Sequence, residues 1–284
     1  MQTTQTLTVN PVVIRNCRFQ SIERLPIMRR IWNRTDVLVF PGMEDRRLIL
    51  GMAASDRALA AVFRLRHQVF GQELGHGTLE ERESGIDRDV FDEQMHHLIL
   101  IDRDSKAVVG TYRVQTVRQG LKHHGIYASQ EFDLTALKPY FPQLVECGRA
   151  CILPAYRKAT SLFTLWSGLV QYVEMTGSRW LFGCCSLNTI DRNEGWRTMA
   201  HIREQGWLAD MPLVTPVAQC SCGDPKREFV SDLGRIDQLP KLFGAYIKLG
   251  AEVISYPAID EPFGTIDFLI LADTTKLRMS SLRR

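Results

Sequence analysis

The sequence lacks the long apolar run that a membrane-spanning helix requires. No stretch of its 284 residues approaches the ~18 consecutive apolar residues that indicate such a helix. The polar N-terminus, MQTTQTLTVNPVVIRNC, also lacks the apolar core of a signal peptide. We therefore expect a cytoplasmic protein whose contact with the inner membrane is at most peripheral.

An excess of either charge is absent as well. The chain has 35 Lys and Arg against 32 Asp and Glu, a formal net charge of +3, and no basic run resembles a polybasic arm. This balance gives no electrostatic reason to expect nucleic acid as a partner.

Paired cysteine motifs are missing too. The seven cysteines form no C-x-x-C pair, and an odd number without an export signal indicates free thiols in a reducing compartment. Cys220 and Cys222 are one residue apart, but no second Cys/His pair accompanies them at the spacing of a zinc finger. We therefore predict no metal site.

Apolar periodicity, in contrast, is plentiful and predicts an α/β domain, residues 46–275, between an N-terminal extension with one or two strands, residues 1–45, and a short basic tail, residues 276–284. Strands are expected at residues 47–53, 96–102, 107–117, 144–153, 180–186, 253–256 and 266–272. Helices are expected after the cap Ser55-Asp56 and at residues 161–175, 193–205 and 239–249, the last closing at Gly250. The order places an antiparallel meander before a βαβ unit.

Two charged residues interrupt the apolar strand expected at residues 144–153. Burying Glu146 or Arg149 is costly unless the charges are paired or used. Residues three apart point to opposite faces of a regular strand, but Gly148 between them suggests a β-bulge that returns both side chains to one face. A splayed strand at this point would open a cleft beside the next strand. A structural ion pair at a strand edge is the alternative.

Other charged residues precede this strand. Arg66 and Phe70 are four residues apart and share one helix face, and Arg113 lies within the strand expected at residues 107–117. The loop before residues 96–102 carries three carboxylates, Asp87, Asp89 and Asp92. Taken separately, these residues also fit structural roles, such as an arginine at the border of an amphipathic helix or a solvated acidic loop.

Taken together, the patterns follow one another along the chain as Arg66-x-x-x-Phe70, Asp89-x-x-Asp92, VVGTYR ending at Arg113, and Glu146-x-x-Arg149. In this order they resemble the motifs of acyl-homoserine lactone synthases, which have the GNAT N-acyltransferase fold. The resemblance implies an α/β GNAT fold whose mixed central sheet is splayed at the strand around residues 144–153 and flanked by helices.

Longer segments within residues 45–275 extend the match: FRLRHQVF, FDEQMHHLILID, ECGRACILPAYR, LFGCCSLN and GAEVISYPAIDEPFGTIDFLIL. They are similar to the bacterial ornithine–acyl carrier protein N-acyltransferases, the hemolysin-like enzymes that make lyso-ornithine lipid. This resemblance implies transfer of a (3-hydroxy)fatty acyl group from acyl carrier protein to the α-amino group of ornithine. It therefore implies an enzyme of ornithine lipid biosynthesis.

One segment departs from the GNAT enzymes that use acetyl coenzyme A. Those enzymes have a glycine-rich pyrophosphate loop before the next helix, whereas residues 156–161 read YRKATS. We therefore expect no bound cofactor, and a donor thioester carried on the 4′-phosphopantetheine of acyl carrier protein. Arg157, Lys158 and the amides at the helix N-terminus are the expected phosphate site.

The resemblance also implies roles for the motif residues. Glu146 is expected to be the general base, and Arg149 to orient it or to bind the carboxylate of the acceptor. Backbone N–H groups of the splayed strand would polarise the thioester carbonyl. The expected acceptor pocket is built by Arg66, Phe70, Asp89, Asp92 and Arg113. Spare carboxylates of residues 87–92 would then hold the cationic side chain of ornithine.

Three alternatives remain open. Cys147 or Cys151 could carry the acyl group in a ping-pong reaction, although no histidine is nearby in sequence. The acceptor could be another amine, as in N-acyl amino acid synthases or acyl-homoserine lactone synthases. The chain could also be a degenerate acyltransferase fold that only binds acyl carrier protein. The presence of both Glu146 and Arg149 argues against this hypothesis.

Overall fold

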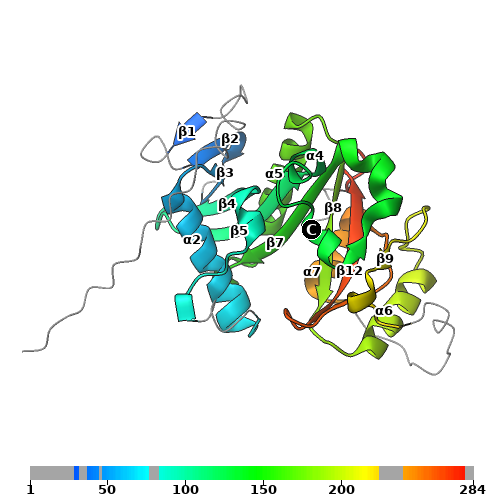
Figure 1. The fold of residues 1–284 in the computed structure, drawn as a ribbon. Helices are drawn as coiled ribbons and strands as arrows, with labels where there is room; N and C mark the ends of the chain where they lie inside the picture. Colours follow the sequence, from blue (N-terminus) through cyan, green and yellow to red (C-terminus); the bar gives the residue numbers. More distant parts are fainter. Residues whose placement is uncertain (1–28, 32–36, 45–46, 77–82, 224–238, 279–284) are drawn as a thin grey trace, which may run out of the picture.

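The computed structural model describes residues 29–31, 37–44, 47–76, 83–223 and 239–278 (Figure 1). At their centre is one mixed sheet in the strand order β1-β2-β3-β4-β5-β7-β8-β12-β10, with β11 paired to β12, and a second sheet joins β6 to β9. The strands are β1 (Arg29–Ile31), β2 (Val37–Glu44), β3 (Leu48–Ala53), β4 (His96–Asp102), β5 (Val108–Thr116), β6 (Phe132–Asp133), β7 (Leu144–Ile152), β8 (Trp180–Leu187), β9 (Thr215–Pro216), β10 (Glu252–Val253), β11 (Ala258–Asp260) and β12 (Thr265–Asp273).

Helices of three kinds connect the strands. The α-helices are α2 (Asp56–Arg66), α4 (Val117–Gly120), α5 (Ala159–Met175), α6 (Arg192–Glu204) and α7 (Lys241–Leu249), and the π-helix η1 (His67–Glu73) continues α2. The 3-10 helices are η2 (Val90–Glu93), η3 (Tyr127–Gln130), η4 (Leu134–Gln143), η5 (Pro154–Tyr156) and η6 (Ala218–Cys220).

The strands β7 and β8 are the parallel neighbours of the main sheet, and its other described strand pairs are antiparallel. They pair from Leu144↔Trp180 to Glu146↔Phe182 and are connected through α5. The predicted meander followed by a βαβ unit is thus confirmed. One or two strands were expected in residues 1–45, and both β1 and β2 begin there, whereas residues 1–28 lie outside the described part.

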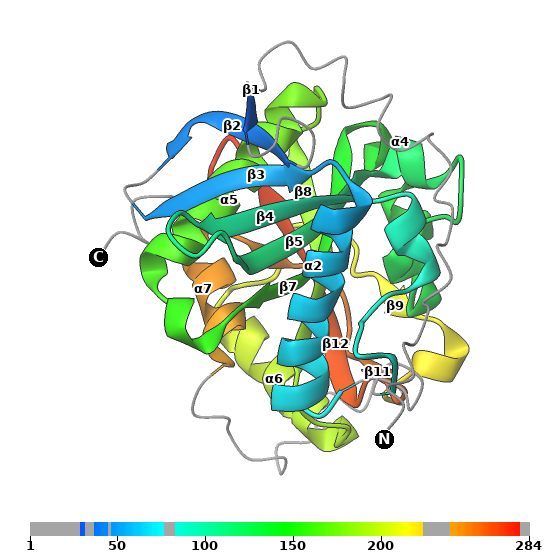
Figure 2. The same cartoon turned by 90° about the vertical axis from the view of Figure 1, so that its left-hand side faces the viewer.

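The two faces of the sheet are covered by different helices (Figure 2). On one face, Leu59 of α2 packs in a core with Ile99 of β4. On the other, Leu98 packs with Trp166 of α5 and Phe243 of α7. Adjacent residues of a strand point to opposite faces, so the alternation along β4 divides the interior into two cores.

Local sequence sets the ends of the predicted helices. The Ser55 side chain accepts a hydrogen bond from the Ala58 N–H and caps α2. Helix α7 ends at Gly250, whose φ of 100° lies in the left-handed region that favours glycine. Both predicted caps are confirmed.

The strand predicted at residues 253–256 is mostly absent, because a side chain replaces part of the backbone ladder. Regular pairing of β10 ends at Val253, and the Ser255 Oγ then accepts the hydrogen bond of the Leu269 N–H. Pro257 has no N–H to donate, and the short β11 follows it. Sequence periodicity missed β11 because it has only three residues.

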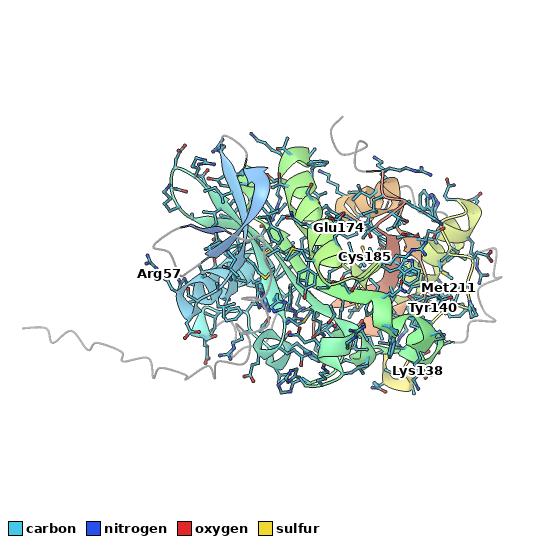
Figure 3. The ribbon with its side chains drawn as sticks, turned by 90° about the horizontal axis from the view of Figure 1, so that it is seen from above. Arg57, Lys138, Tyr140, Glu174, Cys185 and Met211 are labelled. Atoms are coloured by element: carbon cyan, nitrogen blue, oxygen red, sulfur yellow. The ribbon has the colours of Figure 1, made fainter. Side chains whose placement is uncertain are left out.

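The cysteines of the described residues are free, as expected: Cys147, Cys151, Cys184, Cys185, Cys220 and Cys222. Cys185 lies in the interior, whereas Arg57, Lys138 and Glu174 lie at the surface (Figure 3). None of the helices in the described residues has the length and apolar character needed to cross a bilayer.

Candidate active site

The centre of the sheet is split between β7 and β8. Their pairing stops at Glu146↔Phe182, although both strands continue. Position 183 has to be glycine, because a Cβ there would lie 2.0 Å from the carbonyl oxygen of Cys147. The strands therefore touch at this point and then diverge, which confirms the predicted splay.

A β-bulge in β7 lies just beyond the split. Thr111 pairs with Cys151 and Arg113 with Gly148, so the one residue between them on β5 faces two residues of β7. The strained residue is Arg149, with φ of 49°, and not Gly148. The bulge turns Arg149 to the face that carries Glu146.

A cavity of about 550 Å³ passes through this split and reaches both faces of the sheet. Its polar side is lined by Arg113, Tyr127, Glu146, Arg149, Cys184 and Asp267, among others. Its apolar side, under α5 and α7, is lined by Tyr112, Cys147, Trp166, Cys185, Phe243, Tyr246 and Ile270, among others. The cavity can therefore hold a charged group and an aliphatic chain at the same time, on opposite sides of one opening.

Glu146 is buried at the polar side, with 2% of its surface exposed. Its Oε2 accepts hydrogen bonds from Gln115 Nε2 at 2.7 Å and the Tyr127 N–H at 3.1 Å, and Oε1 accepts one from the Ala128 N–H at 2.8 Å. Burial raises the pKa of Glu146 above its ordinary value, while these donors act in the opposite direction. Glu146 is therefore a fixed carboxyl group whose affinity for a proton is above that of an exposed glutamate. Gln115, Tyr127 and Ala128 hold it in place, and Arg149 does not.

The carboxylates of the loop before β4 are already engaged by arginines. Arg66 is fully buried and binds both Asp87 and Asp92, the latter at 2.6 Å. Arg113 binds Asp89 at 2.5 Å and Asp92 at 3.0 Å. Burial alone would raise the pKa of Asp92, but Arg66 and Arg113 hold it well below its ordinary value.

The expectation of spare carboxylates at residues 87–92 is therefore wrong. Asp89 and Asp92 also cap η2 through a reciprocal capping box. Their ion pairs with Arg66 and Arg113 fix this loop to α2 and β5. Of the five predicted acceptor-pocket residues, Phe70 and Arg113 line the cavity, whereas Arg66, Asp89 and Asp92 form the ion-pair network behind it.

Arg149 is held more loosely than the other two arginines of this network. Its Nη2 lies 3.4 Å from Asp89 and its Nη1 3.5 Å from the Tyr127 hydroxyl, and the nearest Asp87 oxygen is 3.7 Å from its Nε. Its guanidinium carbon lies 4.9 Å from the Phe263 ring centroid and 5.3 Å from that of Tyr127. The two rings fix its position while leaving donors available to a ligand in the cavity.

The predicted phosphate site lies at the mouth of the cavity, where α5 begins. Arg157 donates to Ile152 O at 2.8 Å and binds the carboxylate of Glu73 through two nitrogens. Lys158 is exposed and lines the cavity as the N-cap of α5. The first N–H groups of a helix lack partners within the helix, so the place suits an anion, which would compete with Glu73 for Arg157.

The apolar side contains a few buried polar atoms. The hydroxyls of Tyr112 and Tyr246 share a hydrogen bond, and Trp166 Nε1 points toward the Tyr112 hydroxyl without ideal hydrogen-bond geometry. Burial raises the pKa of the Cys147 thiol to about 12, and that of Cys151 likewise. Both cysteines are therefore neutral thiols at physiological pH, which is unfavourable for a nucleophile.

Sequence reasoning missed several residues of this site. Gln115 and Tyr127 hold Glu146, and they occupy ordinary positions in β5 and at the start of η3 that carry no signal in the sequence. Asp267 could have been found, because it interrupts the apolar strand β12 as Glu146 interrupts β7. Glu131 lies in a loop, and only the fold brings it to Asp267.

Comparison with known proteins shows what this chain is similar to. A family model described as an acetyltransferase (GNAT) domain matches residues 65–167. An L-ornithine N(alpha)-acyltransferase of Rhodobacter capsulatus is 31% identical over 230 residues, covering 78% of this chain and 88% of that protein. One of Brucella abortus is 31% identical over 238 residues, covering 78% and 82%. A solved N-acyl amino acid synthase from uncultured soil microbes superposes with a TM-score of 0.48 at 12% identity, over 81% of this chain and 92% of that chain.

Proposed function

This chain belongs to the L-ornithine N(alpha)-acyltransferase family, and from that premise we propose that it transfers a 3-hydroxy fatty acyl group from acyl carrier protein to the α-amino group of ornithine. The product is lyso-ornithine lipid. The observation that carries this proposal is the cavity that crosses the split sheet, with Glu146 on its charged side and an apolar chamber on the other.

The split positions the reacting thioester. The acyl chain lies in the apolar chamber under α5 and α7, and the amino acid lies on the side of Glu146 and Arg149. The thioester carbonyl then sits where β7 leaves β8, beside backbone N–H groups that can stabilise the developing oxyanion. The Trp166 Nε1 and the Tyr112–Tyr246 pair are polar groups that suit a hydroxyl on the acyl chain.

Glu146 supplies the base. It takes a proton from the α-ammonium group, and the neutral amine attacks the thioester carbonyl to form the C–N bond. The C–S bond then breaks, and the second amine proton ends on the departing thiol. A raised pKa makes Glu146 a stronger base than an exposed carboxylate.

Arg149 binds the carboxylate of the amino acid. Its contacts with carboxylates are the longest among the three arginines of this network, and guanidinium binds carboxylate through two parallel hydrogen bonds. Burial opposes its charge, but Tyr127, Asp87 and Asp89 raise its pKa well above the ordinary value, so it remains cationic. This contact places the α-amine toward Glu146.

Acyl carrier protein fits the donor end of the cavity. Residues 156–161 lack the glycines that let a backbone wrap the pyrophosphate of coenzyme A, whereas a phosphopantetheine arm brings a single phosphate. Lys158, Arg157 and the N-terminus of α5 can hold that phosphate. The lipid product is compatible with a cytoplasmic enzyme that makes peripheral contact with the inner membrane.

Lipid analysis tests the proposal. The chain is expressed in a bacterium that has no ornithine lipids, and extracted lipids are analysed by mass spectrometry. We expect an N-acylated ornithine bearing a 3-hydroxy fatty acid. A different acylated amine would move the acceptor assignment to another amino acid, and no acylated amine at all would refute the activity.

A further inference from the structure

A second group of acids lies on the polar side of the cavity, away from the arginine network. Glu131, from the loop before β6, meets Asp267 of β12 and Cys184 of β8, and ligand atoms of the three lie within 4.8 Å of one another. Asp267 and Asp260 line the same cavity as Glu146 and Arg149. The proposed reaction does not yet use these acids.

Both Glu131 and Asp267 are buried without a cation. Each has 4% of its surface exposed. Glu131 Oε2 and Asp267 Oδ1 accept no hydrogen bond from the described residues, and no described Lys, Arg or His forms an ion pair with either carboxylate. Buried carboxylates are ordinarily paired or hydrogen-bonded. Here the two carboxyl groups lie close enough to share a hydrogen bond when one of them is protonated. Asp267 lines the cavity with Glu131 behind it, so a cation that enters through the cavity can replace the shared proton.

The surroundings favour an organic ammonium over a metal ion. The Cys184 thiol donates toward Glu131 Oε1 at 4.0 Å. Burial, together with the charges of Glu131 and Asp267, raises the pKa of Cys184 well above its ordinary value. A neutral thiol is a poor ligand for the soft metals that choose cysteine, whereas two carboxylates suit an N–H donor.

We propose that Glu131 and Asp267, with Asp260 beside them, bind the side-chain ammonium group of the amino acid acceptor and select ornithine over amino acids with apolar side chains. This inference rests on the proposed function. Arg149 holds the α-carboxylate and Glu146 the α-amine, so three methylene groups can extend from them toward Asp267. The Asp87–Asp92 loop cannot serve, since its carboxylates are paired with arginines.

Binding a cation to Glu131 and Asp267 requires the loss of a proton from the pair. Burial, together with the charges of Asp267 and Asp260, raises the pKa of Glu131 to about 10, and burial raises that of Asp267. The titratable and charged groups around Glu131 are Asp267, Asp260, Arg149, Tyr127, Cys184 and Cys220. At neutral pH the free pair therefore holds a proton that the ammonium displaces, so affinity for ornithine rises with pH below about 10.

Steady-state kinetics with a 3-hydroxyacyl carrier protein, comparing ornithine with norvaline, tests the proposal. Norvaline keeps the α-amine and α-carboxylate of ornithine but has no side-chain amine. Wild type should prefer ornithine, and Glu131→Gln or Asp267→Asn should lower kcat/KM for ornithine by ~10²-fold while leaving norvaline unchanged. Glu174→Gln, at an exposed position on α5, is the matched control.

The pH dependence of wild type gives a second readout that needs no variant. KM for ornithine should fall as pH rises from 6 to 9, by up to ~10-fold per unit, and KM for norvaline should lack this extra dependence. An unchanged ornithine preference in both variants would overturn the subsite. Equal use of norvaline and ornithine by wild type would also overturn it while leaving N-acyl transfer standing. Acylation of neither amino acid would refute the proposed function itself.

Discussion

At the residue scale, three arginines meet one group of carboxylates but differ in how tightly they are held. Arg66 is fully buried and Arg113 nearly so, with contacts to Asp92 at 2.6 and 3.0 Å. Arg149 makes only contacts of 3.4 Å or longer and has 14% of its side chain exposed. The first two therefore fix the loop, and Arg149 is the one that can bind a ligand.

Arg149→Lys tests this division. Lysine keeps the positive charge beside Asp87 and Asp89 but loses the fork that binds a carboxylate through two donors. We expect KM for ornithine to rise ~10- to 100-fold, with KM for the acyl donor and the thermal midpoint nearly unchanged. Arg179→Lys, at an exposed ion pair with Asp273, is the control. Normal ornithine kinetics in Arg149→Lys would remove this residue from the acceptor site.

At the element scale, the split between β7 and β8 depends on two glycines with opposite requirements. A Cβ at Gly183 would collide with the Cys147 carbonyl oxygen, whereas a Cβ at Gly148 meets nothing within 4 Å. Gly148 also has an ordinary φ, because the left-handed residue of the bulge is Arg149. The first glycine thus holds the strands together, and the second keeps the cavity open.

A pair of alanine substitutions separates these roles. Gly183→Ala should lower the free energy of unfolding by ~3 kcal/mol or more, because the new methyl group clashes with the Cys147 backbone, which can shift only if β7 is distorted. Gly148→Ala should leave stability unchanged but lower kcat/KM for acyl transfer, since the new methyl group enters the cavity. Gly244→Ala on α7, where a Cβ also meets nothing, should be neutral or slightly stabilising. Thermal unfolding and kinetics of the three variants measure this, and a stable, active Gly183→Ala would contradict the account.

Most elements that build the site could be predicted from sequence. Alternating or continuous apolar residues marked β4, β5, β7, β8 and β12, and a charge inside β7 pointed to chemistry. The bulge was also predictable from Gly148, but the left-handed conformation of Arg149 was not, because the contacts of Arg149 with the rings of Tyr127 and Phe263 form only in the folded chain. The pairing of the acidic loop was not predictable, because which arginine meets which carboxylate depends on three-dimensional packing.

At the scale of the whole molecule, one cavity passes through the split in the sheet and joins a charged side to an apolar side. Strands β5, β7 and β12 bring the charged groups, the α5 and α7 side brings the apolar chamber, and the N-terminus of α5 lies at the mouth of the cavity. Acceptor and donor can therefore approach from different sides of the sheet. Substitutions at the mouth of the cavity should therefore change KM for the acyl donor and leave KM for the acceptor unchanged.

Lys158→Glu tests the approach of the donor. A carboxylate at the N-cap of α5 repels the phosphate of the phosphopantetheine arm, so we expect KM for acyl carrier protein to rise ~10-fold or more, with KM for ornithine unchanged. Because exposed charges are screened, the difference from wild type should shrink at high salt. Lys138→Glu, an exposed lysine of η4, should behave as wild type (Figure 3). An unchanged KM for acyl carrier protein in Lys158→Glu would place donor binding elsewhere.

The most direct test of the central claim is the rate of acyl transfer to ornithine by Glu146→Gln, measured with purified protein and 3-hydroxyacyl carrier protein. Glutamine has the shape of glutamate but cannot take up the amine proton, so kcat should fall ~10²- to 10⁴-fold. Binding of both substrates should persist, and Glu174→Gln should react at the wild-type rate. Wild-type turnover by Glu146→Gln would contradict the assignment of Glu146 as the base at the split in the sheet.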